Sequence, residues 1–105
     1  MKIEVISIPG CPNHQPTLDR VKALLISEEV AEEDVREILI DNKSDAQALE
    51  FFGSPTVRVN GKDVEPVTAL RPSLSCRIYA DGTGIPSETA LILAIRFAKE
   101  EEWPR

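Results

Sequence analysis

The chain has 105 residues, of which 42% are hydrophobic and 29% charged, and its formal net charge at neutral pH is -6. This length allows one compact core and is too short for two, so residues 1–105 are expected to form a single domain. The acidic balance, without a basic cluster to offset it, repels phosphate backbones and argues against nucleic acid as a partner.

Neither a membrane partner nor a disulfide framework is expected. No apolar run approaches the roughly 20 residues that a membrane-spanning helix needs, and the first residues do not resemble a signal peptide. We therefore expect a cytoplasmic protein. Cys11 and Cys76 are the only cysteines, and in a reducing compartment both should rest as thiols unless they react.

The chain opens with a predicted strand, turn and helix. Residues 2–8 form a mostly apolar run that is typical of a buried strand, and the pair Pro9-Gly10 ends it. Apolar residues then recur at helical spacing up to about Ser27, which predicts an amphipathic helix. These residues are Leu18, Val21, Leu24 and Leu25.

A second strand and a second, shorter helix are predicted next. Residues 35–40 are mainly apolar and form the strand. Asn42 or Ser44 can cap the short helix, and Gly53 is well placed to end it. The first half of the chain is therefore predicted to be βαβα.

The second half predicts two strands and a final helix. Residues 55–59 form a short strand that leads into the Asn60-Gly61 turn, since this pair tolerates the positive φ of tight turns. Residues 62–74 have no clean period and are expected to be irregular, and residues 75–80 are predicted to form the last strand. Ser87 can cap the final helix. Its apolar face carries Leu91, Ala94, Ile95 and Ala98.

The complete order, βαβαββα, predicts an α/β fold with helices on both faces of a four-stranded mixed sheet. Two parallel strands come first and an antiparallel pair follows. Many topologies share this order, so only the sequence motifs narrow the choice further.

Two motifs carry a resemblance to a known fold family. The segment Pro9-Gly10-Cys11-Pro12-Asn13-His14, between a strand and a helix, resembles the active-site segment of thioredoxin-fold proteins, in which two cysteines open the first helix. The segment Gly53-Ser54-Pro55-Thr56-Val57 resembles their cis-proline segment, which starts the next strand beside the reactive cysteine. Together with the element order, this resemblance covers nearly the whole chain and implies a thioredoxin-like fold.

The whole chain, including Ser75-Cys76-Arg77-Ile78-Tyr79, is most similar to small bacterial thioredoxin-like proteins. Some of these are loosely labelled as related to alkylmercury lyase, a label that by itself does not imply mercury chemistry. The chain departs from the family pattern because His14 stands where the second motif cysteine would be, giving CxxH in place of CxxC. A disulfide within the motif is therefore impossible, which argues against ordinary dithiol exchange.

Cys11 and His14 are the candidate catalytic residues. If Pro12 is the first helical residue, Cys11 lies at the N-cap, where free N–H groups and the helix dipole stabilise a thiolate. His14 can then add a hydrogen bond or, when protonated, a positive charge. If the helix begins at Pro16 instead, the dipole argument weakens. The alternatives are a partly buried Cys11 without chemistry and an exposed His14 bonded to water.

Pro12, Ser54 and Pro55 are the candidate substrate-binding residues. A proline commonly enters an edge strand in the trans form, and cis bonds make up only about 5–6% of X-Pro bonds in folded proteins. The resemblance nevertheless favours a cis bond before Pro55. Such a bond leaves the Ser54 backbone beside Cys11, able to pair with an extended substrate segment.

Cys76 is the candidate second thiol. If residues 75–80 form the last strand, its end near Ala80 returns to the Pro55 side and Cys76 lies about 13 Å from it. A disulfide needs Cα atoms within about 7 Å. A direct bond to Cys11 is therefore disfavoured, unless residues 62–74 fold back, and we prefer to interpret Cys76 as a small buried apolar residue.

No metal or cofactor is expected. One histidine and two cysteines fall short of the four ligands of a closed zinc site, and no glycine-rich phosphate loop is present. A soft ion accepts two thiolates, but the same distance argument applies to it.

Two functions follow from these residues. The first is a monothiol thiol-disulfide oxidoreductase, in which Cys11 attacks a disulfide and an external thiol such as glutathione completes the exchange. Its partners would be a thiol or disulfide, either a small molecule or a protein segment. The alternative is a non-catalytic thioredoxin-like binding module for a peptide or a soft metal ion. In a purely structural role, both cysteines would be unreactive.

Overall fold

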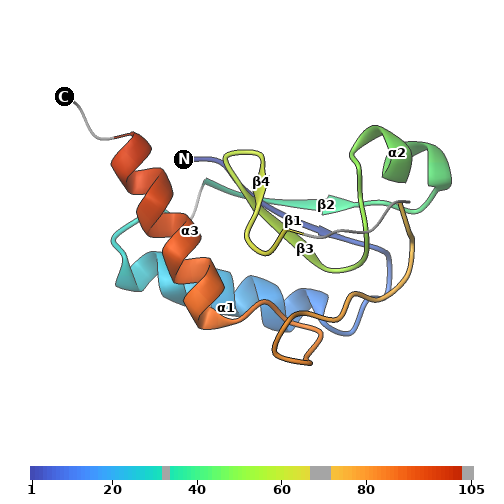
Figure 1. Cartoon of the computed structure of the whole chain (residues 1–105), viewed down its shortest axis with the longest axis horizontal. Helices are drawn as coiled ribbons and strands as arrows, with labels where there is room; N and C mark the ends of the chain where they lie inside the picture. Colours follow the sequence, from blue (N-terminus) through green and yellow to red (C-terminus); the bar gives the residue numbers. More distant parts are fainter. Residues whose placement is uncertain (32–33, 67–71, 103–105) are drawn as a thin grey trace.

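The structure is a computed structural model that describes residues 1–31, 34–66 and 72–102. Figure 1 shows a twisted sheet with helices on either side. The long helices α1 (His14–Ser27) and α3 (Glu88–Glu101) lie together on one side, and the short helix α2 (Lys43–Ala48) lies on the other, near one end. The α/β class and the helices on both faces are as the sequence predicted.

The sheet contains β1 (Ile3–Ser7), β2 (Val35–Leu39), β3 (Thr56–Val59) and β4 (Lys62–Asp63). Their order across the sheet is β2-β1-β3-β4. β1 and β2 are parallel, whereas β1 with β3 and β3 with β4 are antiparallel. The four-stranded mixed sheet of the sequence analysis is thus confirmed, and β1 is one of its two central strands.

Alternation along β1 divides the core into two clusters, because successive side chains of a strand point to opposite faces. Ile3 and Val5 belong to the larger cluster, which α1 and α3 cover, and Ile6 belongs to the smaller one beneath α2. The buried members of the larger cluster are Ile3, Val5, Leu18, Val21, Leu25, Val57, Val59, Leu91, Ile95 and Ala98. Those of the smaller cluster are Ile6, Ile40, Ala46 and Phe51.

Two of the predicted helix caps are present. The Asn42 side chain accepts a hydrogen bond from the Asp45 N–H at 2.8 Å, and the Ser87 hydroxyl accepts one from the Ala90 N–H at 3.1 Å. Of the two candidates, Asn42 caps α2. The expected end of this helix at Gly53 is wrong: α2 ends at Ala48, and Glu50 already has a positive φ of 51°.

The last strand differs from the prediction. The Asn60-Gly61 turn forms as expected, with φ values of 51° and 81°, and it places Val59 opposite Lys62. Because a two-residue turn returns the chain at once, the antiparallel partner of β3 starts directly after Gly61, inside the stretch expected to be irregular. Residues 67–71 of that stretch lie outside the described residues.

The predicted strand over residues 75–80 is wrong. This segment has no strand ladder and makes a single isolated parallel bridge, between Ser54 and Cys76. Since β4 already occupies the free edge of β3, the later segment pairs only with the residues that precede β3. Two backbone hydrogen bonds form the contact. The first joins Ser54 N–H to Ser75 C=O, and the second joins Arg77 N–H to Ser54 C=O.

None of the helices in the described part of the chain is both long and apolar enough to cross a membrane.

Candidate functional site

Cys11 lies in the loop that joins the carboxyl end of β1 to the start of α1. Its N–H donates to the Ile8 carbonyl at 3.3 Å, and its own carbonyl accepts from the His14 N–H at 3.2 Å. Gly10 supplies the positive φ of 74° that turns the chain. The thiol is free and partly buried. The loop therefore presents one sulfur at the end of a central strand.

The start of α1 differs from both expected positions. The helix begins at His14 with Asn13 as N-cap, so it starts neither at Pro12 nor at Pro16. Cys11 is two residues before the N-cap rather than at it. It therefore does not occupy the position at which the sequence predicted that free N–H groups and the helix dipole would stabilise a thiolate. Pro16 lies in the first helical turn, where its missing N–H removes no intrahelical bond. Pro12 is exposed in the preceding turn.

His14 is held by two other side chains, neither of them Cys11. Its Nδ1 lies 2.6 Å from the Ser7 hydroxyl oxygen, and its Nε2 lies 2.7 Å from Oε1 of Glu37. Ser7 is fully buried at the end of β1, while the Glu37 side chain is half exposed on β2. The expectation that His14 bonds to the cysteine or to water is replaced by a chain of three protein groups.

The hydrogen-bond directions in the series Ser7, His14 and Glu37 depend on which atoms carry protons. With neutral His14, the Ser7 hydroxyl donates to Nδ1 and the Nε2–H donates to Glu37. With protonated His14, both ring nitrogens donate, and the Ser7 hydroxyl accepts instead. A proton taken up at His14 therefore reverses the Ser7 hydrogen bond and pairs the ring with a carboxylate. Neither Ser7 nor Glu37 was predicted from the sequence, although a serine at the end of a buried strand is a usable signal.

Ser54 connects the Cys11 loop to the rest of the site. The Ser54–Pro55 bond is cis, as expected, and both residues are buried. The Ser54 hydroxyl accepts a hydrogen bond from the Ile8 N–H at 3.0 Å. Because Cys11 in turn bonds to the Ile8 carbonyl, the thiol loop and the segment before β3 are linked through one residue.

The Ser54 backbone is already paired with the chain itself. Its N–H donates to the Ser75 carbonyl at 2.8 Å, and its carbonyl accepts from the Arg77 N–H at 2.9 Å. The expectation that this backbone pairs with an extended substrate segment is therefore corrected: residues 75–77 fill that position. A peptide would have to displace them before it could bind there.

Cys76 is the middle residue of the segment that occupies this position. It is exposed, so the interpretation as a small buried apolar residue is wrong. The separation of about 13 Å expected between Cys76 and the Pro55 side assumed that the end of a strand near Ala80 lies there. In the structure, Cys76 itself is directly opposite Ser54. The two cysteines of the chain thus belong to the two segments that contact Ser54.

Arg77 anchors the same segment from the inside. Its buried guanidinium makes a bidentate ion pair with Asp63, with nitrogen to oxygen distances of 2.8 and 3.0 Å, and it also donates to the Glu65 carbonyl. The guanidinium carbon lies 4.2 Å from the centre of the Tyr79 ring. Arg77, which directly follows Cys76, therefore holds this end of the segment against β4 and the turn after it.

Tyr79 closes the site beneath Pro55. Its hydroxyl donates to the Pro55 carbonyl at 2.5 Å, and its side chain is buried. Burial raises the pKa of Tyr79 strongly. The nearby Arg77 charge lowers it, and the negative charges of Asp63, Glu65 and an ionised Cys11 raise it further.

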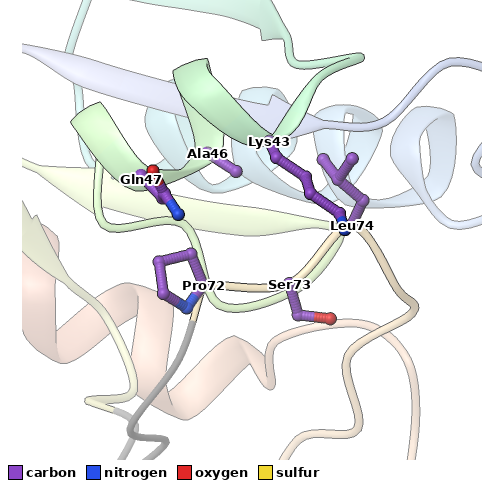
Figure 2. A pocket seen from close by; sticks show the side chains of 6 residues that line it. All are labelled: Lys43, Ala46, Gln47, Pro72, Ser73 and Leu74. Carbon is purple, nitrogen blue, oxygen red and sulfur yellow. The ribbon is translucent and has the colours of Figure 1, made fainter.

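A hollow of about 490 Å³ lies elsewhere, between α2 and the segment 72–74. Figure 2 shows Lys43 and Gln47 extending from the helix toward Pro72, Ser73 and Leu74. The residues that line it include neither cysteine. The hollow is therefore separate from the Cys11 site, although Ser73 and Leu74 lead directly into the segment that carries Cys76.

In residues 1–31, 34–66 and 72–102, no group of three or more His, Cys, Asp or Glu side chains is placed to hold a metal ion.

Comparisons of the chain with protein-family models, with curated proteins and with solved structures find no match in any of the three.

Proposed function

We propose that this protein is a thioredoxin-like domain that exchanges thiols and disulfides through one motif thiol, Cys11. The observation that carries the proposal is the position of a free, partly exposed sulfur at the carboxyl end of β1, in a loop linked to the Ser54–Pro55 segment. The strand order β2-β1-β3-β4, with β3 antiparallel to β1, is compatible with the fold that the sequence motifs imply.

In this function, the Cys11 thiolate attacks one sulfur of a disulfide. A mixed disulfide forms at Cys11, and the other half of the substrate leaves as a thiolate. An external thiol such as glutathione then attacks Cys11 Sγ and releases the bound half as a thiol, which leaves glutathione on Cys11. A second glutathione attacks the sulfur of that bound glutathione, so that glutathione disulfide leaves and the Cys11 thiol is restored. Over the full cycle, the substrate disulfide is reduced and the external thiol is oxidised.

His14 supports this chemistry as a positioning residue. Its ring ties the first turn of α1 to Ser7 on β1 and to Glu37 on β2. Since His14 N–H also bonds to the Cys11 carbonyl, the ring holds the end of the thiol loop in place. Pro12 is exposed and can still contact a substrate, as expected. Ser54 and Pro55 are buried, and Ser54 holds the loop through its bond to Ile8.

The test is exchange with glutathione disulfide, followed by mass spectrometry and by iodoacetamide labelling against pH with peptide mapping. We expect a glutathione adduct on Cys11 of the native protein and no exchange in the Cys11→Ser variant. Cys76→Ser is the matched control and should still form the adduct on Cys11. Exchange by Cys11→Ser at the rate of the native chain would contradict the proposal.

The alternative function is a non-catalytic binding module. The occupied Ser54 backbone disfavours an extended peptide, whereas the presence of both cysteines around Ser54 favours a soft metal ion, which two thiolates suffice to bind. This alternative predicts stoichiometric binding that either cysteine-to-serine change weakens, together with the absence of disulfide exchange in the native protein.

A further inference from the structure

The second thiol of the chain is placed by the pairing of Ser54. In the parallel bridge, Cys76 is the residue directly opposite Ser54, with Ser75 and Arg77 making the two hydrogen bonds on either side. Facing residues of neighbouring strands carry their side chains on the same side of the pair. The Cys76 side chain therefore lies on the side to which the Ser54 hydroxyl is directed.

The Ser54 hydroxyl is also directed to Ile8, the residue to which the Cys11 loop is bonded. The Ser54 hydroxyl bonds to the N–H of Ile8, whose carbonyl bonds to the N–H of Cys11. Only Ile8 and Ser54 thus separate the two cysteine segments along this path of hydrogen bonds. Neither cysteine is in a disulfide; Cys76 is exposed and Cys11 is partly buried.

The segment that carries Cys76 is held by side-chain bonds on its Arg77 side, and on its other side by the backbone bonds of Ser73 to Phe51 and of Ser75 to Ser54. Arg77 is buried and bonded to Asp63, Thr56 and Glu65, whereas Ser75 and Cys76 are exposed. The segment also lacks a ladder beyond its single bridge. Cys76 can therefore move toward the Cys11 loop at the cost of the two bonds to Ser54, whereas a residue inside a continuous strand would have to break a whole ladder.

We propose that Cys76 is the resolving thiol of the Cys11 site, and that the two cysteines form a reversible disulfide during exchange. This inference rests on the proposed reaction of Cys11. It assigns to Cys76 the step that the missing second motif cysteine would perform, at the position where a substrate segment was expected.

The steps balance in atoms and electrons. The Cys11 thiolate attacks a substrate disulfide, and the first half of the substrate leaves as a thiolate. The Cys76 thiolate then attacks Cys11 Sγ, and the second half leaves, so that a Cys11–Cys76 disulfide remains. The two cysteines lose two protons and two electrons in total, and the substrate disulfide, which is the oxidant, is reduced to two thiols. A small thiol such as glutathione later reduces the protein disulfide.

The experiment is to treat the fully reduced chain with glutathione disulfide, remove the reagent, and follow the intact mass without added thiol. In the native protein the adduct on Cys11 should disappear, leaving a product lighter than the reduced chain by two hydrogen atoms. Digestion should then yield one cross-linked peptide with both cysteines. An intramolecular thiol acts at an effective concentration on the order of mM, which is sufficient for this release.

Two variants make the result specific. In Cys76→Ser the adduct on Cys11 should persist until an external thiol is added, and because position 76 is exposed the variant should fold normally, which thermal unfolding checks. In the double variant Ser75→Cys, Cys76→Ser, the thiol is moved by one residue, to the opposite side of the segment. We expect its adduct to persist as well.

The outcomes separate this inference from the proposed function. A native protein that forms the Cys11 adduct but keeps it as long as Cys76→Ser does would overturn the resolving role and leave exchange by Cys11 intact. A native protein that forms neither an adduct on Cys11 nor the Cys11–Cys76 disulfide would overturn the proposed function, and the resolving role with it. Resolution by the shifted thiol at the native rate would overturn the assignment to position 76.

Discussion

His14 Nε2 lies 2.7 Å from Glu37 Oε1, in a contact that joins the first residue of α1 to the neighbouring strand β2. On the other side of the ring, the buried Ser7 hydroxyl has Nδ1 as its partner. The start of the helix is therefore fixed by one bond at the surface and one in the interior. The interior bond should carry more of the stabilisation, because an unpaired buried polar group cannot turn to water.

Replacing His14 by alanine should lower the free energy of unfolding by about 1–3 kcal/mol, because the buried Ser7 hydroxyl loses its partner. Glu37→Gln should cost no more than about 1 kcal/mol, since its side chain is half exposed. Urea unfolding of both variants measures the difference. Equal losses in the two variants would contradict the greater weight given to the interior bond.

Tyr79 gives a direct test by pH, because it is the only tyrosine in the chain. Burial raises its pKa above the ordinary value of 10.0, so tyrosinate absorbance should not develop in the folded protein until the pH is well above that value. The unfolded chain ionises near pH 10 and the folded chain does not, so the unfolded state binds fewer protons above this pH. Stability from Tyr79 is thus complete below about pH 10 and falls as the pH rises further.

The measurement is a spectroscopic titration of native and urea-unfolded protein. Tyr79→Phe, which removes the hydroxyl and leaves the Pro55 carbonyl without its donor, should cost about 1–3 kcal/mol and abolish the titration. A native titration midpoint equal to that of the unfolded chain would show that the hydroxyl is not buried against Pro55.

The stability of the fold is expected to depend on both partners of the ion pair between Arg77 and Asp63. Asp63→Ala leaves the buried guanidinium without a counter-charge and should destabilise the protein by about 3–5 kcal/mol. It should also release the segment 75–77, so that Cys76 is alkylated faster at a temperature where the variant is still folded. Asp19→Ala, which removes a carboxylate exposed on α1, is the control for charge alone.

Gly53 is required by both its backbone conformation and its surroundings. Its φ is 139°, and a Cβ atom there would lie 2.9 Å from Cβ and 3.3 Å from Cα of Arg77. Gly53→Ala should therefore cost at least about 1–3 kcal/mol from overpacking, in addition to backbone strain. Gly82→Ala is the matched control, because it has a positive φ of 85° and open space around the site. Similar thermal unfolding of the two variants would exclude the close approach to Arg77.

Much of the local structure was predictable because its signals are short-range. The apolar run of β1 and the spacing of Leu18, Val21 and Leu25 depend only on neighbouring residues. The same holds for the Asn60-Gly61 turn and the cap at Ser87, where a residue's own conformational preference or its side-chain hydroxyl is sufficient. These features also led to the correct class of fold.

The errors occurred where a partner lies far along the chain. The strand expected over residues 75–80 has suitable residue types, but the edge of β3 was already taken by β4. A histidine ring can bond to many polar side chains, and nothing in the sequence around His14 indicates that its partners are Ser7 and Glu37. The burial expected for Cys76 failed for the same reason, because it depended on an incorrect strand.

By itself, the sequence determined that Cys11 follows a buried strand and precedes an amphipathic helix, since periodicity and turn residues act over a few neighbouring positions. Only the tertiary structure decided that Cys76 lies opposite Ser54 and that residues 75–77 occupy the place expected for a substrate. The physical reason is that backbone N–H and C=O groups are alike in every residue. Which of them meet is set by the packing of the whole chain.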